Sequence, residues 1–511
     1  MKNRSNIKRY KLFILIGILF AGFACSEKFF DEQAGERINP EDHFKSLIDL
    51  EISWLGAMAP LQEAMPRLIM LDGLRSDMMD VTPRADLYLK AINNQSFTLD
   101  NPYINGADLY KVIINVNEIL ANIDKVAQVD RELDAFLLKQ YKGALIGFRT
   151  WSYLNILKLY GTAALIPDNM TTLPENMNQT FLTREVMLDT LINQLKPHIF
   201  DNNAVTEYVE FMTMPYTNPK AVLGELYLEK NDYVNAADFL KKAIESYGNG
   251  TVQYKLDRTY TNEGWKNIFV NSENGTIENI STVAFDFNES QPNPLTKWML
   301  ASDMFMVKPT SAVVDSFKTQ MQLTGTLGDL ARGIKVTYDT TSTGEAYISK
   351  YAIDKGEPYS SDIIISRAAD LHLLLAEALN RMGDSKTALI ILNAGFNAES
   401  VKPAPYFTWS SGLGVRGRAY LQPKLAPDSI NGAPITPIAL TEYVEDLIIQ
   451  ERALELAFEG KRWFDLVRIA KRRGPQYLAN KVAAKFSDTA KAQEIRTKLM
   501  NESNWYLPYK K

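Results

Sequence analysis

Two segments of the chain repeat one helical-hairpin pattern in the same register, and this constrains the fold more than any other sequence feature. The first is residues 221–245 (AVLGELYLEKNDYVNAADFLKKAIE) and the second is residues 373–393 (LLLAEALNRMGDSKTALIILN). Gly224 aligns with Ala376, and a turn containing Asn, Gly or Asp follows at the same distance in both. Small residues at helix contacts and such turns are typical of tetratricopeptide units. The chain is therefore predicted to be mainly α-helical, with stacked helix pairs.

Helical periodicity also dominates the segments before the first repeat. Residues 110–126 place Val and Ile side chains on one face of a helix. Residues 132–160 form a longer helical stretch, and Gly161 stands where a helix-ending glycine is expected. These segments predict helices that pack next to the repeat units.

The middle of the chain differs in composition. Residues 248–365 are rich in Asn, Thr, Gly, Pro and aromatic residues, and residues 282–287 (TVAFDF) alternate like a strand before the QPNP sequence at 291–294 breaks it. Residues 400–440 are again rich in Pro and Gly. We expect an irregular, loop-rich capping region with a few short strands over a helical base, and long ordered loops of this kind are usually functional.

The N-terminus has the features of an export signal. Basic residues up to Lys11 precede an apolar run, residues 12–24, which is too short for a transmembrane helix of about 20 residues. Cys25 follows at once and is the only cysteine in the chain. We predict a lipoprotein signal peptide at 1–24, lipidation of Cys25 and a tether at 25–40.

Charge narrows the range of ligands. The formal net charge of the chain is −5, and residues 1–24 carry five basic and no acidic residues, so the predicted mature chain has a net charge of −10. Nucleic-acid binding requires clustered Lys and Arg, and this balance excludes it as the expected function.

The order and spacing of four segments resemble the SusD/RagB family of surface nutrient-binding lipoproteins. They are residues 143–161 (GALIGFRTWSYLNILKLYG), 221–245, 363–384 (IIISRAADLHLLLAEALNRMGD) and 451–468 (ERALELAFEGKRWFDLVR), with a closing NWYLPY at 504–509. The resemblance extends over almost the whole chain after the signal peptide. It implies a SusD-like superhelix of tetratricopeptide-like repeats, divided into a helical part at 41–247, a ligand-side region at 248–365 and a C-terminal helical part at 366–511.

The same resemblance implies a role. Members of this family bind a nutrient oligomer, most often a glycan, and pass it to a TonB-dependent outer-membrane transporter of the SusC type. The chain is then expected to face the cell exterior on a lipid anchor and not to be an enzyme. Two alternatives remain open: a peptide-binding member of the same family, and a surface glycosidase that uses two carboxylates. A protein-binding scaffold is a further possibility for a tetratricopeptide array.

The segment 451–468 holds the densest charge. Glu451, Glu455 and Glu459 are spaced to share one helical face. The charged residues that flank them are Arg452, Arg462, Asp465 and Arg468. We interpret this segment as an ion-pair network that holds the C-terminal helix, with Trp463 packed beside it, and not as an acid/base site. Arg149 and Arg367, each expected on a helix among apolar residues, are interpreted in the same way.

Sequence motifs for other chemistry are missing. His43, His198 and His372 are far apart, and the chain has no HExxH, GxSxG, P-loop or strand-linked GxGxxG sequence. We therefore expect no metal and no cofactor. A glycan site needs flat aromatic side chains to stack on sugar rings and polar groups to bind their hydroxyls. The candidate ligand-binding residues are Asp77, Asp80, Arg84, Tyr88, Tyr260, Trp265, Asn288, Trp298, Tyr406 and Trp409, with Arg416 as a further polar partner. Segment 71–88 ranks first among them.

Overall fold

The computed structural model describes residues 43–171, 180–199, 217–245, 254, 256, 259–270, 278–352, 358–393, 413–430 and 432–509. Helices account for most of these ranges. They are α2 (Leu47–Arg75), α3 (Leu87–Asn93), α4 (Ala107–Val129), α5 (Ala135–Tyr160), α6 (Arg184–Leu195), α7 (Pro219–Glu229), α8 (Tyr233–Glu245), α9 (Asn262–Val270), α10 (Pro294–Met299), α11 (Ser311–Lys318), α12 (Ala368–Arg381), α13 (Ser385–Leu392), α14 (Val415–Arg418), α15 (Pro437–Glu455), α16 (Arg462–Arg473), α17 (Pro475–Ala483) and α18 (Thr489–Leu499).

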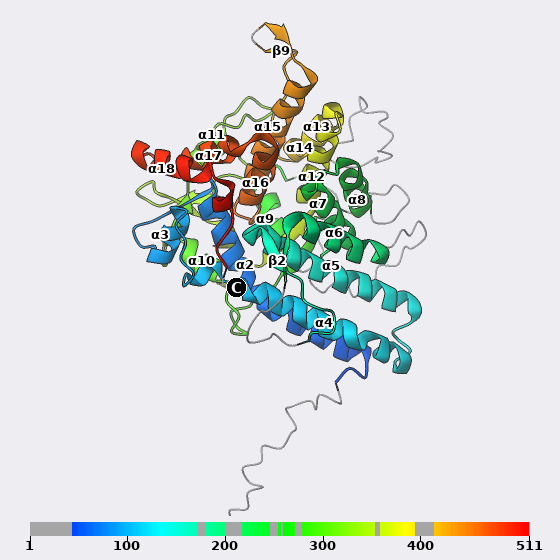
Figure 1. Ribbon diagram of the computed structural model, residues 1–511. Helices are drawn as coiled ribbons and strands as arrows, with labels where there is room; N and C mark the ends of the chain where they lie inside the picture. The colour runs from blue at the N-terminus through cyan, green and yellow to red at the C-terminus, as the bar shows by residue number, and fades with distance from the viewer. Residues whose placement is uncertain are drawn as a thin grey trace, which may run out of the picture.

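The strands are short and form two-stranded antiparallel pairs. The pairs are β1 (Met79–Val81) with β5 (Val307–Pro309), β2 (Thr162–Ala164) with β3 (Phe181–Thr183), β4 (Asn279–Val283) with β8 (Ile363–Arg367), β6 (Tyr338–Thr340) with β7 (Ala346–Ile348), and β9 (Ser429–Ile430) with β10 (Ala433–Pro434). In Figure 1 the β9–β10 hairpin projects beyond the N-terminal end of α15 at the top of the molecule. The expected fold class, helical repeats with an irregular region and a few short strands, is confirmed.

The helices form one continuous stack. Each of α2, α4, α5, α6, α7, α8, α12, α13 and α15 contacts the next member of this series, and Figure 1 shows the stack rising from α4 at the bottom to α13 and α15. One large hydrophobic cluster extends through these helices. No helix within the described residues combines the length and the apolar character needed to cross a membrane.

The two repeat segments are the helix pairs α7–α8 and α12–α13, and α8 packs directly on α12. Asn231 and Gly383 occupy equivalent turn positions and both have a positive φ, 62° and 93°. Gly224 packs so closely on α8 that an added Cβ would lie 2.7 Å from Leu240 Cγ. The small residue that the sequence places at this helix contact is therefore required by the packing.

The two helices expected before the first repeat are present, and the end of the second at Gly161 agrees with the structure. The segment 110–126 lies within α4, and 132–160 corresponds to α5, which starts after the N-cap Asp134. Gly161 ends α5 in the left-handed region, with a φ of 72°. The ring of Tyr506 lies over Gly161, 2.9 Å from where a Cβ would be, so both the backbone angle and the close approach require glycine here.

The strand expected at 282–287 is wrong in its position. The strand β4 ends at Val283, because the chain then leaves the ladder with β8. Phe285 N–H donates to a side-chain oxygen of Asp362, and Asp286 and Gln291 pair through backbone hydrogen bonds of 2.9 and 2.8 Å. The alternating pattern therefore spans a strand end and a tight turn.

Candidate ligand-binding site

An open groove of about 540 Å³ lies between α2, the short 3-10 helix η2 (Pro102–Ile104) and the segment that leads into α10. Its lining residues are Gln62, Glu63, Pro66, Arg67, Pro102, Tyr103, Phe285, Ser290, Gln291, Pro292, Pro294 and Trp298. The volume is within the range of small-molecule sites, roughly 300–1,000 Å³. We call it the Trp298 groove.

Two aromatic side chains dominate this groove. Trp298 and Tyr103 are both half-buried and meet edge to face, with ring centroids 6.0 Å apart. The Tyr103 hydroxyl donates to Asp86 Oδ2 at 2.9 Å. Burial and the neighbouring Asp86 carboxylate both raise the pKa of Tyr103, so its hydroxyl stays protonated at neutral pH. The pair offers rigid apolar ring surface at the groove wall.

Trp298 is positioned by the cap of its helix. Asn293 is fully buried; its Oδ1 accepts from Leu295 N–H at 2.9 Å and its Nδ2 donates to Ser361 O at 2.6 Å. At the other end of α10, Met306 N–H donates to Trp298 O at 2.7 Å. The QPNP sequence therefore begins a helix and does not end a strand, because its Asn293 caps the helix that carries the groove tryptophan.

The wall formed by α2 is polar and has a proline at its centre. Gln62 Nε2 donates to Ala284 O at 2.7 Å and to Gln291 Oε1 at 3.1 Å. Pro66 lies inside α2 and has no N–H to donate to the carbonyl of Gln62, so that carbonyl lacks its usual helical partner. Arg67 pairs with Asp108 beside the groove. Amide and carbonyl groups therefore border the aromatic surface.

Four of the residues expected from sequence are accessible at least in part, and one of them lines this groove. Trp298 lines it. Asn288 is exposed at the tip of the turn between Asp286 and Gln291 that supplies part of the lining. Arg84 is exposed and its guanidinium donates to Asp303 O at 3.2 Å. Tyr88 is 37% exposed on α3, where its backbone carbonyl accepts from Asn101 Nδ2 at 3.2 Å.

Other expected residues are part of the interior. Trp265 has no exposed surface, and the guanidinium carbons of Arg418 and Arg367 lie 5.0 and 5.4 Å from its ring centroid, so it offers no face to a ligand. The Asp77 carboxylate accepts two hydrogen bonds from Arg462, at 2.7 and 2.8 Å. Burial opposes the charge on Asp77, but Arg462 holds its pKa below the usual value.

The remaining expected residues fall into three groups. Asp80 Oδ1 accepts from Asn93 Nδ2 at 2.9 Å, and Arg416 is buried against Glu451, so both serve the fold. Tyr260 is exposed but pairs with Tyr420 at a centroid distance of 5.3 Å, away from the Trp298 groove. Tyr406, Trp409 and Cys25 lie outside the described residues.

Sequence reasoning missed Gln62 and Tyr103. Gln62 lies in a largely apolar sequence, which predicts a helix packed in the core. Tyr103 follows Pro102 in a segment without a recognisable motif. The one available signal is Pro66, because a proline inside a helical pattern marks a position where backbone groups lose their partners.

The segment 451–468 forms an ion-pair network, as interpreted. The helix α15 ends at Glu455, and Glu459 lies in a turn with Gly460 at a φ of 75°, so the three glutamates do not share one continuous helix. Glu455 nevertheless accepts from Arg367 and Arg332, each at 2.7 Å, and also from Arg418. All of these side chains are buried.

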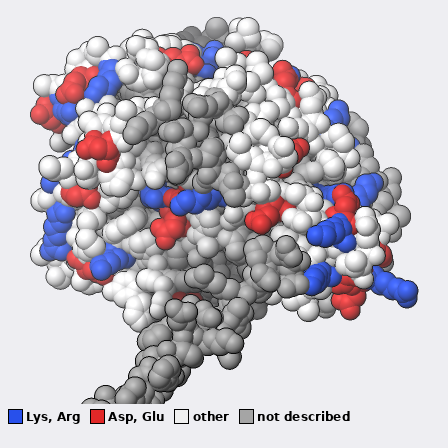
Figure 2. All heavy atoms as spheres, turned by 60° about the horizontal axis from the view of Figure 1, so that its bottom comes forward, with Lys and Arg blue, Asp and Glu red and all other residues white. Residues whose placement is uncertain are grey.

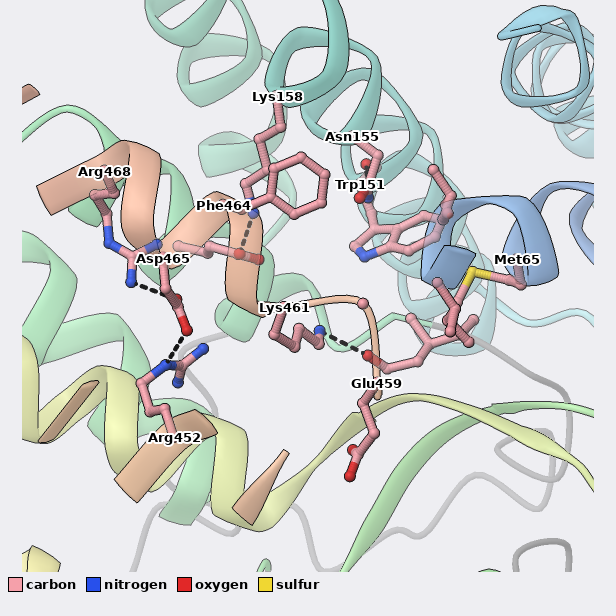
Figure 3. A pocket seen from close by; sticks show the side chains of 15 residues that line it. Met65, Trp151, Asn155, Lys158, Arg452, Glu459, Lys461, Phe464, Asp465 and Arg468 are labelled. Atoms are coloured by element: carbon pink, nitrogen blue, oxygen red, sulfur yellow. Dashed lines mark hydrogen bonds and ion pairs between the residues drawn. The ribbon is translucent and has the colours of Figure 1, made fainter. Parts of the chain in front are cut away.

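A second part of this network surrounds a small internal cavity of about 30 Å³, shown in Figure 3. Asp465 lies between Arg452 and Arg468, with a hydrogen bond of 2.7 Å to each. Lys461 points across the cavity and donates to Ile365 O at 2.9 Å. The cavity has room for about one water molecule. Two of its carboxylates, Glu459 and Asp465, are buried and paired with Lys350 and Arg452, which supports a structural role.

Comparison with known proteins agrees with this fold. Residues 282–511 match the model of the SusD family. A SusD-like protein of Formosa agariphila is 23% identical, over 92% of this chain and 93% of that protein.

Solved structures show the same fold. A SusD superfamily protein from Bacteroides vulgatus superposes with a TM-score of 0.66 at 17% identity, covering 89% of this chain and 93% of that one. A laminarin-binding SusD-like protein superposes with a TM-score of 0.56 at 16% identity, covering 88% and 97%. The family model over residues 282–511, the SusD-like relative and the common fold agree, and the chain is similar to proteins of the SusD/RagB family.

Proposed function

We propose that this protein is a lipid-anchored outer-membrane protein that binds an oligo- or polysaccharide in the Trp298 groove and delivers it to a TonB-dependent transporter of the SusC type. The groove carries the proposal. Its Trp298–Tyr103 pair supplies aromatic surface for the apolar faces of sugar rings. The Gln62 and Gln291 amides and the Gln62 carbonyl supply hydrogen-bonding groups at its edge.

The lining of the groove supports capture and not cleavage. A glycosidase needs two carboxylates about 5–9.5 Å apart on either side of the bond. Glu63 is the sole carboxylate among the described residues that line the groove. The carboxylates of segment 451–468, in contrast, are buried and paired with arginines.

Peptide binding is the second candidate within the same architecture. Figure 2 shows one face of the molecule, on which acidic and basic side chains are interspersed and separated by broad areas of other residues. Such a mixed surface does not set up a field of one sign that would attract a strongly charged peptide. A neutral glycan needs no such field and can use the aromatic surface of the groove, so it is the favoured ligand.

The anchor and the partner rest on sequence features. The apolar run at 12–24 directly before Cys25 supports lipidation, and the match of residues 282–511 to the SusD family model supports a SusC-type partner. The acidic net charge argues against nucleic acid as ligand.

Calorimetry on the full-length chain in detergent tests the proposal. The titrants are a panel of neutral and anionic polysaccharides, laminarin among them, and a mixed peptide pool, with a product assay run in parallel. We expect saturable binding of a neutral glycan without release of shorter sugars. Trp298→Ala is expected to weaken it about tenfold, which is about 1.4 kcal/mol.

Two matched variants sharpen this experiment. Trp298→Phe keeps a ring and should retain most of the affinity. Tyr443→Ala removes an aromatic that is 36% exposed on α15 and is not among the lining residues of the Trp298 groove, so this variant should bind as the wild type does. Binding of peptides alone would favour the second candidate, and release of short sugars would refute the non-enzymatic role.

A further inference from the structure

A second groove of about 770 Å³ lies on the other side of the segment that walls the first. Its lining residues are Gln95, Ser96, Phe97, Leu99, Tyr160, Gly161, Thr162, Ser503, Asn504, Tyr506, Leu507, Pro508 and Tyr509. We call it the Tyr506 groove. Residues 97–103 separate the two sites: Phe97 and Leu99 line the Tyr506 groove, whereas Pro102 and Tyr103 line the Trp298 groove.

The C-terminal segment builds this groove by alternation. Trp505 and Leu507 are buried, while Tyr506 and Pro508 between and after them are half-buried at the groove wall. Leu507 N–H donates to Leu159 O at 2.8 Å, and Trp505 Nε1 donates to Leu499 O at 2.8 Å. The inward residues thus anchor the segment to the ends of α5 and α18, and the other residues line the groove.

Aromatic rings form the groove surface. Tyr506 lies over Gly161, where only a glycine leaves room for the ring, and Lys471, which is paired with Glu502, places its Nζ 5.6 Å from the centroid of the same ring. Tyr509 stacks on Phe181 at a centroid distance of 4.8 Å and meets Tyr160 edge to face at 6.2 Å. Leu99, 61% exposed, borders the same space. These side chains give a rigid apolar surface in a groove large enough for several sugar units.

The polar residues of the lining determine which ligand suits it. They are hydroxyl and amide side chains, and among the described lining residues none carries a charge at neutral pH. Recognition of a phosphate, a carboxylate or a cationic peptide requires charged partners, whereas a neutral glycan needs aromatic faces with hydroxyl and amide groups around them.

We propose that the Tyr506 groove is a second binding site for a neutral glycan. It holds a second segment of the polysaccharide molecule whose first segment occupies the Trp298 groove. This inference rests on the proposed function, since it assumes that the ligand is a polymer. The shared wall at residues 97–103 places the two sites next to each other on one molecule. A chain long enough to reach both gains affinity, because its second contact is intramolecular.

The test compares short and long ligands on the full-length chain. Calorimetry is run with laminarin and other neutral polysaccharides and with short oligosaccharides prepared from each of them. For each polysaccharide that binds, the wild type is expected to have a higher affinity for the polymer than for the short oligosaccharide prepared from it. Tyr506→Ala and Tyr509→Ala should weaken polymer binding roughly threefold to tenfold and leave fragment binding in the Trp298 groove unchanged.

Further variants separate binding from folding. Tyr509→Phe keeps the ring and should bind as the wild type does. Leu99→Ser changes a residue that is 61% exposed, and it should still weaken polymer binding. Tyr443→Ala is the control outside both grooves. Thermal unfolding of each variant, measured in parallel, identifies any loss that comes from misfolding.

The outcomes distinguish the two proposals. If Trp298→Ala weakens binding and the variants of Tyr506, Tyr509 and Leu99 bind the polymer as the wild type does, the second site is overturned and the proposed function stands. If the Tyr506-groove variants weaken polymer binding and Trp298→Ala does not, the second site stands and the Trp298 groove loses its assignment. If no neutral glycan in the panel binds, the assignment of this groove to a neutral glycan is overturned.

Discussion

Replacing Gly224 by alanine tests whether close packing of α7 on α8 stabilises the repeat unit. The new Cβ would lie 2.7 Å from Leu240 Cγ and 3.1 Å from both Leu240 Cδ2 and the Leu240 backbone nitrogen. These atoms are near the backbone of α8 and not at the tip of a flexible side chain, so one helix must shift. Overpacking of this kind costs about 1–3 kcal/mol.

The same substitution has an opposing effect that a control removes. Alanine is favoured over glycine inside a helix by about 1 kcal/mol, partly through the unfolded chain. Gly56 is an exposed helical glycine of α2, and a Cβ there would meet nothing within 4 Å. Gly56→Ala therefore reports the helix preference alone. Subtracting its change in free energy of unfolding from that of Gly224→Ala leaves the packing cost of about 1–3 kcal/mol.

Urea denaturation of both variants, followed by circular dichroism, measures this difference. A third variant identifies the atoms responsible: in a Leu240→Ala background, Cγ and Cδ2 are absent, so Gly224→Ala should lose most of its cost. If Gly224→Ala stabilises the protein as much as Gly56→Ala does, the steric argument for glycine at the repeat contact is wrong.

Two further predictions concern the buried charges. Glu455→Ala leaves Arg332, Arg367 and Arg418 without a shared carboxylate and should destabilise the protein by about 3–5 kcal/mol. Its control is Glu494→Ala, which removes an exposed partner of Lys491 and should change the free energy of unfolding by less than about 1 kcal/mol in the same denaturation assay. Burial alone would raise the pKa of Glu377, but Arg468 and Arg472 lower it to about 2, below the value of about 4.3 in an unfolded chain. The charged carboxylate therefore stabilises the protein fully above about pH 4.3, and this effect is lost as the pH falls toward 2. Glu377→Gln should flatten the acid side of a stability-against-pH curve, and an unchanged curve would show that the carboxylate is not charged in the folded state.

The helices could be predicted because their signals are local. Apolar periodicity, the N-cap Asp134 and the helix-ending Gly161 all act within a few residues, and the structure has helices where they indicate them. The repeat added one non-local fact, the packing of two equivalent hairpins, because a repeated contact pattern implies a repeated neighbour.

The candidate site was less predictable, since its parts come from distant segments. Trp298 could be chosen as an aromatic beside a chain break, but its partner Tyr103 is nearly two hundred positions earlier. Trp265 and Trp298 look alike in sequence, and the buried arginines that enclose Trp265 come from positions 367 and 418. Which aromatic is accessible therefore depends on contacts that no local pattern encodes.

Arg367 shows the same limit on a smaller scale. It was expected on a helix, but it is the last residue of β8 and stands directly before α12. Its guanidinium there reaches Glu278, Glu455 and Glu459. A helical pattern that begins at residue 368 cannot show that the preceding residue is held in a strand by pairing with Asn279.

The buried network also has a consequence for how this architecture can diversify. Arg332, Arg367 and Arg418 all pair with Glu455 at the end of α15, and Glu278 pairs with both Arg367 and Arg418. Each long excursion between these four residues therefore begins and ends at a fixed charged point. Doubling the length of a loop between fixed ends costs only about 0.6 kcal/mol. Insertions and deletions between these points are therefore inexpensive, while the four ends stay in place. Evolution can change the outer surface of such a protein for new ligands without disturbing the helical stack that supports it.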